Sequence, residues 1–274
     1  MERTCYKLIA LDLDGTLLDS SHSITARARR AIERILESGR LAVFATGRCR
    51  AETEEYLALF PGMRYLICEN GACVLDLFQD RAICTRPIDP QTGEQVIRAV
   101  EREEVLAAFF IGNRPFMDRK AMGRLEEFGL ESYRDVFERN VVRVEELYAF
   151  YRDKPLQVEK INLYFRSRTE GERIRERIEG LPLTFSSSIA GNLEINAAGV
   201  NKGSGLKALC DWLDIPLGQV IAVGDNSNDC QMLEMAGLPV VMGNAVPGLR
   251  PLGRVMAPDC DHDGAAVIME RYML

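Results

Sequence analysis

The stretch Leu8-Ile9-Ala10-Leu11-Asp12-Leu13-Asp14-Gly15-Thr16-Leu17-Leu18 joins an apolar run to two carboxylates. Its first four residues are typical of a buried strand, and Asp12 and Asp14 follow where that strand ends. Residues two apart in an extended chain point to the same side, so we expect both carboxylates in one site. Their charges would repel by about 4 kcal/mol at a separation of about 4 Å and an effective dielectric constant near ~20. The pair therefore needs a cation, a shared proton or an open path to water.

Two other interpretations of this stretch follow from its residue types. A calcium-binding loop that starts at Asp12 needs a glycine at its sixth position and a glutamate at its twelfth. Leu17 and Ser23 stand at those positions, which excludes that interpretation. An Asp-x-Asp-Gly sequence is also common in solvated turns that have no chemical role. The stretch alone leaves this second alternative open.

A pattern of buried strand and helix repeats in both terminal parts of the chain. Residues 6–11, 41–45 and 65–68 are apolar strand patterns. A helical pattern with Thr25 as N-cap and Gly39 as its terminating glycine separates the first two. Fully apolar strands that alternate with helices predict a parallel sheet covered on both faces. We therefore expect a Rossmann-like, doubly wound α/β core, to which three more apolar segments belong, at residues 220–223, 239–242 and 254–257.

The pattern changes after about residue 82. Residues 105–117 have the pattern of a β-hairpin. Apolar and polar residues alternate over 160–165, which is typical of a half-buried antiparallel strand. We therefore expect an α+β domain inserted into the core, and we expect it to act as a lid. The expected core comprises residues 1–82 and 190–274, and the inserted cap domain comprises residues 83–189.

The overall composition limits the kinds of partner. The chain has 274 residues, of which 47% are hydrophobic and 27% charged, and its net charge is -7. An acidic chain without a basic block is a poor match for nucleic acid. No apolar run reaches the ~18 residues of a membrane span, and the N-terminus lacks the pattern of a signal peptide. We expect a cytoplasmic protein, a monomer or small homo-oligomer, that binds neither nucleic acid nor a membrane.

The eight cysteines and two histidines indicate no site of their own. The cysteines are scattered without a Cys-x-x-Cys pair, so the spacing of a zinc site is absent, and a disulfide framework is not expected in a cytosolic chain of this length. We expect most of them to be small buried apolar residues. His22 and His262 both occur in polar, loop-like contexts, which disfavours chemistry that depends on a histidine base.

Four polar sets stand directly after strand patterns or at the junction of a strand and a helix. In open α/β sheets, ligands bind outside the carboxyl ends of the strands, so we expect these sets to meet. Carboxylates without a histidine or thiolate partner suit a hard cation such as Mg²⁺. A hydroxyl group, a lysine and glycine amides suit a phosphate group. The sets are Asp12 with Asp14, Thr46-Gly47-Arg48, Lys202, and Asp225 with Asn228 and Asp229.

In this order, the sets resemble the haloacid dehalogenase (HAD) superfamily of phosphatases, and within it the Cof-type group with a large α/β (C2-type) cap. The resemblance rests on Asp12–Leu18, Thr46–Arg48, Asn201–Gly203 and Gly224–Asp229. Further segments similar to those of the group are Glu69–Ala72, Met242–Ala245 and Asp263–Ala265. The motifs cover both parts of the core, whereas the cap resembles the group only in length and pattern. One departure is Ala197-Ala198-Gly199, where the family often has a proline.

The resemblance implies a role for each of these residues. Asp12 would attack phosphorus and carry the phosphoryl group as an aspartyl-phosphate, while Asp14 would protonate the leaving group and then activate water. The Mg²⁺ ligands would be Asp12, the backbone carbonyl of Asp14, Asp225 and Asp229, the last of which could instead orient Lys202. The phosphoryl oxygens would be held by Leu13, Thr46, Gly47, Lys202 and Asn228, and Arg48 could either reach the substrate or pair with an acidic neighbour.

The resemblance thus implies a Mg²⁺-dependent phosphatase of small phosphate monoesters, such as sugar or polyol phosphates, whose partner is a small phosphorylated metabolite. Two alternatives stay open. A phosphomutase or phosphotransferase on the same fold would pass the phosphoryl group to another hydroxyl. A receiver-like signalling module would keep the phosphate on Asp12, but it would have no use for a large cap or for the acid Asp14.

Overall fold

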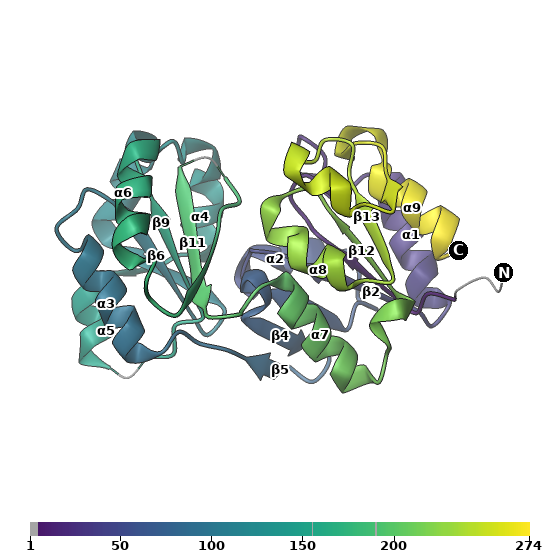
Figure 1. The fold of residues 1–274 in the computed structure, drawn as a ribbon, viewed down its shortest axis with the longest axis horizontal. Helices are drawn as coiled ribbons and strands as arrows, with labels where there is room; N and C mark the ends of the chain where they lie inside the picture. The colour runs from purple at the N-terminus through teal and green to yellow at the C-terminus, as the bar shows by residue number, and fades with distance from the viewer. Residues whose placement is uncertain (1–4, 155, 190) are drawn as a thin grey trace. The chain divides into compact units, whose positions relative to one another are not determined.

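The computed structural model describes residues 5–154, 156–189 and 191–274, and the chain divides into two compact units (Figure 1). The expected junctions at 82/83 and 189/190 differ from those of the structure. The first expected junction would cut a strand of the first unit, and the second would separate a strand from the sheet of the second unit. Ala190 itself lies outside the described residues. The first unit comprises Met1–Arg48, Thr53–Thr85 and Asn201–Leu274, and the second comprises Cys49–Glu52 and Arg86–Val200.

The first unit is built on an eight-stranded sheet in the order β14-β13-β12-β1-β2-β3-β4-β5. From β14 to β3 the neighbouring strands run parallel, and β4 and β5 add an antiparallel edge. The predicted α/β class with a parallel core sheet is therefore confirmed. The strands are β1 (Leu8–Leu11), β2 (Leu41–Ala45), β3 (Tyr65–Cys68), β4 (Cys73–Asp76), β5 (Arg81–Thr85), β12 (Val220–Gly224), β13 (Leu238–Val241) and β14 (Val255–Met256).

Helices cover both faces of this sheet. Successive residues of a strand point to opposite sides, so both sides of a fully apolar strand need a cover. In β1, Ile9 and Leu11 pack in one core cluster, and Leu8 and Ala10 pack in another on the opposite face. The first cluster includes residues of α1 (Ala26–Glu37), α2 (Arg50–Leu57) and α9 (Gly264–Tyr272), and the second includes residues of α7 (Lys202–Leu213) and α8 (Cys230–Met235).

Local signals in the sequence explain where some of these elements begin and end. The Thr25 hydroxyl accepts a hydrogen bond from the backbone N–H of Ala28 at 3.1 Å, as predicted for the N-cap of α1. Gly39 has φ +78°, a value that favours glycine after a helix. The β4–β5 hairpin was not predicted, because β5 is a largely exposed edge strand without a continuous apolar run.

The second unit is built on a six-stranded sheet in the order β10-β11-β9-β6-β7-β8, in which only β7 and β8 pair in parallel. The predicted hairpin is present, with Gly112 at φ +58° and Asn113 at φ +63° between β6 and β7. Among the residues that the structure describes, no helix has both the length and the apolar character needed to cross a membrane. The elements are α3 (Pro90–Val100), β6 (Leu106–Ile111), β7 (Arg114–Asp118), α4 (Arg134–Asn140), β8 (Val142–Val144), α5 (Leu147–Asp153), β9 (Lys160–Tyr164), α6 (Arg168–Ile178), β10 (Leu183–Ser186) and β11 (Asn192–Ala197).

The expectation that residues 160–165 form a half-buried strand is wrong, because every residue of β9 is buried. The charged group of Lys160 and the amide nitrogen of Asn162 have polar partners, whereas Asn162 Oδ1 has no hydrogen-bond partner among the described residues. Lys160 Nζ lies 3.7 Å from a carboxylate oxygen of Glu194 on β11, and Asn162 donates to the Tyr164 hydroxyl at 3.1 Å. Buried polar groups that have partners cost little, so an alternating pattern does not require water on the polar face.

Candidate active site

Asp12 lies where β1 ends, and the residue is only 4% exposed. Its backbone N–H donates to the carbonyl of Val223 on the parallel neighbour β12 at 3.1 Å. The Asp12 carbonyl accepts from the N–H of Leu17 at 3.3 Å, which turns the chain back on itself. The sheet therefore positions this carboxylate at the carboxyl end of β1, next to the end of β12.

Lys202 is the first residue of α7, and its side chain is completely buried. Asn201 and Ser204 form a capping box that starts the helix at this residue. Lys202 Nζ lies 2.7 Å from Asp12 Oδ1 and 2.7 Å from Asp229 Oδ1, so one ammonium joins residues from three separate parts of the sequence. Burial alone would lower the pKa of Lys202, but the two carboxylates raise it above its ordinary value, so the side chain stays charged.

Asp229 organises the loop that follows β12. Its Oδ2 accepts from the backbone N–H groups of Asp225 at 2.9 Å and Asn226 at 3.0 Å, while Oδ1 faces Lys202. Both carboxylate oxygens of Asp229 therefore already have polar partners. Of the two roles expected for Asp229, this geometry favours orienting Lys202 and the loop over binding a metal ion directly.

Asp12, Asp225 and Asp229 each offer a carboxylate oxygen, and these oxygens lie within 4.8 Å of one another. Burial, and next the charge of Asp229, raise the pKa of Asp12 well above its ordinary value. The same two causes, in the same order, raise the pKa of Asp225 to about 6. This negative cluster has one lysine among three carboxylates, and it would be stabilised by a further cation.

The surroundings of the cluster fit Mg²⁺. The donor set consists of hard oxygen atoms, which Mg²⁺ prefers. Thr16 Oγ1 donates to Asp225 Oδ1 at 2.8 Å and so orients this carboxylate. Gly15, at φ +76°, lies so close that a Cβ on it would be 2.4 Å from Asp225 Oδ2. Glycine at position 15 therefore leaves space next to the Asp225 carboxylate, and the Cβ of any other residue at this position would occupy that space.

Asp14 has a different environment from Asp12. Arg48 binds it in bidentate fashion, from Nε to Oδ2 at 2.8 Å and from Nη2 to Oδ1 at 2.6 Å, and His22 Nδ1 lies 3.7 Å from Oδ1. Burial raises the pKa of Asp14, but the hydrogen bonds and charge of Arg48 outweigh it and the net shift is downward. The structure thus joins Asp14 to Arg48, while the three other aspartates gather around Lys202.

Thr46 and Asn228, both predicted to hold phosphoryl oxygens, are connected through Asn70. The Thr46 hydroxyl accepts from the N–H of Arg48 at 3.1 Å, and the Thr46 carbonyl accepts from the N–H of Asn70 at 3.0 Å. Asn228 Nδ2 donates to Asn70 Oδ1 at 3.3 Å. The other two predicted positions, Leu13 and Gly47, directly follow Asp12 and Thr46 in the chain.

Asn70 and Asn244 are site residues that our sequence analysis did not assign. Asn244 Nδ2 donates to the carbonyl of Gly15 at 2.7 Å, and its Oδ1 accepts from the N–H of Cys260 at 3.1 Å, so it ties the loop after β1 to the C-terminal region. Both asparagines lie in segments that resemble those of the Cof-type group. This resemblance was the signal in the sequence from which a role for them in the site could have been predicted. Only the fold shows which loops they connect.

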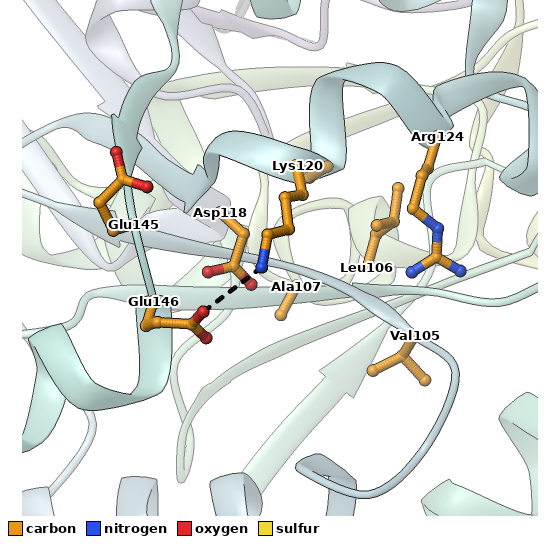
Figure 2. Close-up of a pocket in the computed structure, with 9 residues that line it drawn as sticks. Val105, Leu106, Ala107, Asp118, Lys120, Arg124, Glu145 and Glu146 are labelled. Carbon is orange, nitrogen blue, oxygen red and sulfur yellow. Dashed lines mark ion pairs between the residues drawn. The ribbon is translucent and has the colours of Figure 1, made fainter.

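A pocket in the second unit contains none of the predicted site residues (Figure 2). Its volume is about 130 Å³, and charged side chains from β7, the segment after it and the segment before α5 line it. Figure 2 shows Lys120 turned toward Glu146, with 3.6 Å between the two charged groups, and Arg124 pairs with Glu104 at 2.7 Å. Because its cations already have acidic partners, we assign no ligand to this pocket.

Comparisons with known proteins show which family and which folds the chain is similar to. A family model described as haloacid dehalogenase-like hydrolase matches residues 9–269. Phosphatase YwpJ of Bacillus subtilis (strain 168) is 28% identical to this chain, over 97% of this chain and 100% of its own length. An HMP-PP phosphatase of Yersinia pestis (strain Pestoides F) is 27% identical, over 98% of this chain and 96% of its own length. The solved structure of a haloacid dehalogenase-like hydrolase from B. subtilis has a TM-score of 0.84 at 28% identity and covers 97% of this chain and 99% of that chain.

Proposed function

The chain belongs to the haloacid dehalogenase-like hydrolase family, and from this premise we propose that it is a Mg²⁺-dependent phosphatase that cleaves small phosphate monoesters through an aspartyl-phosphate. One observation carries the proposal. Lys202 Nζ lies 2.7 Å from both Asp12 and Asp229, with Asp225 in the same cluster. A buried carboxylate beside a lysine and a metal-binding cluster is a suitable nucleophile for a phosphate dianion.

In the first step, Asp12 attacks phosphorus. One of its oxygens faces Lys202, which leaves the other to form the new P–O bond as the bond to the leaving alcohol breaks. Lys202, Thr46, Asn228 and the backbone amides of Leu13 and Gly47 hold the phosphoryl oxygens. Asp14, protonated at this stage, gives its proton to the departing alkoxide. In the second step Asp14 takes a proton from water, which attacks phosphorus, releases inorganic phosphate and regenerates the Asp12 carboxylate.

The proposed Mg²⁺ would be held by Asp12, Asp225 and the Asp14 carbonyl, with Asp229 orienting the loop. When bound, it would offset the charge that the phosphate adds to three carboxylates. Thr16 orients Asp225 by donating to it at 2.8 Å, and Gly15 leaves space beside the Asp225 carboxylate because it has no Cβ.

Arg48 connects substrate binding to the protonation of Asp14. A carboxylate in a bidentate pair with Arg48 is held ionised and has no proton to donate. A bound phosphoryl group offers Arg48 a stronger anionic partner. We propose that Arg48 turns to the substrate, so that Asp14 takes up the proton that it later delivers. The substrate class we propose, sugar or polyol phosphates, rests on the resemblance to the Cof-type group.

The test is phosphate release from p-nitrophenyl phosphate and from a panel of sugar and polyol phosphates, with Mg²⁺ present. We expect hydrolysis that EDTA stops and that added Mg²⁺ restores. The Asp12→Asn variant should lose at least ~10⁴-fold in turnover. Asp211→Asn is the matched control, since Asp211 is an exposed carboxylate paired with Lys207. Substantial turnover by Asp12→Asn would overturn the assignment of the nucleophile, and transfer of phosphate to added sugar instead of water would indicate a phosphotransferase.

A further inference from the structure

A second group of metal-ligand side chains lies where β3 and β4 meet. Cys68 at the end of β3 and Cys73 at the start of β4 are direct partners in the antiparallel ladder, so their side chains lie on the same face of the sheet. Glu69 begins the turn between them. The two sulfur atoms and a carboxylate oxygen of Glu69 all lie within 4.8 Å of one another, and the three residues are at most 1% exposed.

The distances and the donor atoms fit a borderline-soft cation. Two thiolates bound to one tetrahedral Zn²⁺ have sulfur atoms about 4 Å apart. In the structure, Cys73 Sγ lies 3.8 Å from Glu69 Oε2, and Cys68 Sγ lies 3.7 Å from the Cys73 carbonyl. Because the three donor atoms lie within 4.8 Å of one another, small movements of these side chains and of the turn that carries Glu69 would bring them onto one ion. Two sulfur donors and one carboxylate suit Zn²⁺ or Cd²⁺ and do not suit Mg²⁺, which prefers oxygen.

We propose that Cys68, Glu69 and Cys73 form a binding site for a Zn²⁺-type cation, separate from the Mg²⁺ site. On binding, the two thiols lose their protons to solvent and the sulfurs and the Glu69 carboxylate bond to the metal, which leaves one position for water. This site could not be predicted from the sequence, because Cys68 and Cys73 do not have the Cys-x-x-Cys spacing. The strand pairing brings them together.

Metal at this site would act on the phosphate-binding residues through the turn Glu69–Gly71. The Glu69 N–H donates to the Arg48 carbonyl at 2.9 Å, and the Asn70 N–H donates to the Thr46 carbonyl at 3.0 Å. Asn70 Oδ1 also accepts from Asn228. Drawing Glu69 onto a metal ion moves this turn, and with it three residues proposed to hold phosphate. We therefore expect a bound metal ion at this site to lower phosphatase activity. This expected effect on activity rests on the proposed function, whereas the proposal that the site binds a metal ion does not.

Cadmium reports directly on the site, because Cd²⁺ bound to thiolates has a charge-transfer absorption in the ultraviolet. The experiment titrates the whole chain with Cd²⁺ and measures the ultraviolet absorbance. We expect the charge-transfer band to grow until one equivalent of Cd²⁺ is bound. Cys68→Ser and Cys73→Ser should each bind at least about tenfold more weakly. Cys210→Ser is the matched control, a buried cysteine in the other core cluster of the first unit. Absence of the band in the wild type, or equal loss in Cys210→Ser, would overturn the site.

X-ray absorption on the wild type loaded with one equivalent of Zn²⁺ tests the same site without a variant, so a variant that fails to fold does not decide the matter. We expect two sulfur ligands per zinc. A coordination shell without sulfur would place the ion elsewhere and refute the proposal.

The effect on activity is measured at saturating Mg²⁺. Zn²⁺ should inhibit the wild type but not Cys73→Ser, and a chelator selective for Zn²⁺ should restore activity. Equal inhibition of Cys73→Ser would mean that Zn²⁺ acts at the catalytic cluster, which would refute the coupling. If the wild type hydrolyses no phosphate ester at all, the proposed function fails, while the cadmium result still decides whether the metal site exists.

Discussion

Asp12 and Asp14 are two residues apart, yet their side chains lie in different electrostatic environments. Asp12 is buried beside Lys202 and two other carboxylates, and Asp14 is partly exposed and paired with Arg48. Their pKa values shift in opposite directions as a result, upward for Asp12 and downward for Asp14. A nucleophile must be ionised and a general acid protonated, so the proposed roles require both shifts to be reversed: bound Mg²⁺ would lower the pKa of Asp12, and release of Arg48 to the substrate would raise the pKa of Asp14.

Replacing Asp14 tests its role as the acid. Asn cannot donate a proton to the leaving group, so we expect Asp14→Asn to lower kcat/KM by about 10²- to 10⁴-fold for an alkyl phosphate such as glycerol phosphate. The loss should be much smaller for p-nitrophenyl phosphate, because p-nitrophenolate leaves without a proton. Steady-state kinetics on both substrates measure the difference. Equal losses would show that Asp14 does not protonate the leaving group.

Substitutions at Gly15 and Gly39 can be compared to test whether Gly15 is needed for the placement of the Asp225 carboxylate. Both have a positive φ, +76° and +78°, so alanine at either costs about 1 kcal/mol in backbone strain. Only at Gly15 would the new Cβ meet another group, 2.4 Å from Asp225 Oδ2, whereas nothing lies within 4 Å of it at Gly39.

We expect Gly15→Ala to raise the Mg²⁺ concentration needed for half-maximal activity and to lower the free energy of unfolding by more than Gly39→Ala does. Gly39→Ala should leave the Mg²⁺ response unchanged. Urea denaturation and activity measured against Mg²⁺ concentration give both quantities. If the two variants responded identically to Mg²⁺, Gly15 would have no special relation to Asp225.

Among the secondary-structure elements, α7 determines where Lys202 lies. The helix starts at Lys202 because the side chain of Asn201 accepts from the Ser204 N–H at 2.9 Å and the Ser204 hydroxyl accepts from the Asn201 N–H at 3.1 Å. A helix that frayed by one turn would release the lysine from between its two carboxylates. We therefore expect the cap of this helix to support both the stability of the fold and the proposed chemistry.

Asn201→Ala should lower the free energy of unfolding by about 1 kcal/mol, as expected for loss of an N-cap. It should also lower kcat/KM, because Lys202 loses its fixed position. Ser167→Ala removes the N-cap of α6 in the second unit, where Ser167 accepts from the Glu170 N–H at 3.3 Å, and should affect stability alone. Denaturation and kinetics on both variants make the comparison. Unchanged kinetics in Asn201→Ala would contradict the positioning role of the cap.

In the whole molecule, each of the two units has its own hydrophobic core, with clusters on both faces of its sheet. The second unit also buries Glu159, whose carboxylate accepts from the Gly112 N–H at 3.1 Å. Burial raises the pKa of Glu159 to about 7, from an ordinary value of 4.5. The folded chain therefore binds a proton at pH values where the unfolded chain has lost it.

This shift makes stability depend on pH. Because the folded pKa is raised, stability falls as the pH rises from about 4.5 to about 7, by up to about 3 kcal/mol. Glu159→Gln cannot ionise and keeps an oxygen that can accept from Gly112. We expect this variant to unfold at higher urea concentration than the wild type at pH 8, with the difference shrinking toward pH 5. A difference independent of pH would show that ionisation of Glu159 is not its cause.

Most of the core fold could be predicted from the sequence, because a strand covered on both faces must be apolar at every position and β1, β2, β3 and β12 are. The polar residues after them could be assigned to one site because parallel strands share a carboxyl edge. The second unit was harder. The exposed edge strand β5 lacks an apolar run, and the polar residues of β9 are buried with polar partners, Lys160 with Glu194 of β11 and Asn162 with Tyr164 of β9 itself. The first expected junction, at 82/83, fell inside β5 for the first of these reasons.

Residue types and their order along the chain determined the fold class, the family and the acidic character of the candidate site. Only the tertiary structure decided which groups meet: Asp14 with Arg48, Asp229 with Lys202, Asn70 with Asn228, and Cys68 with Cys73. A local pattern reports what one segment needs from its surroundings, such as burial or a turn. The partner of a charged or polar side chain comes from a segment far along the chain, so it depends on how the whole sheet is assembled.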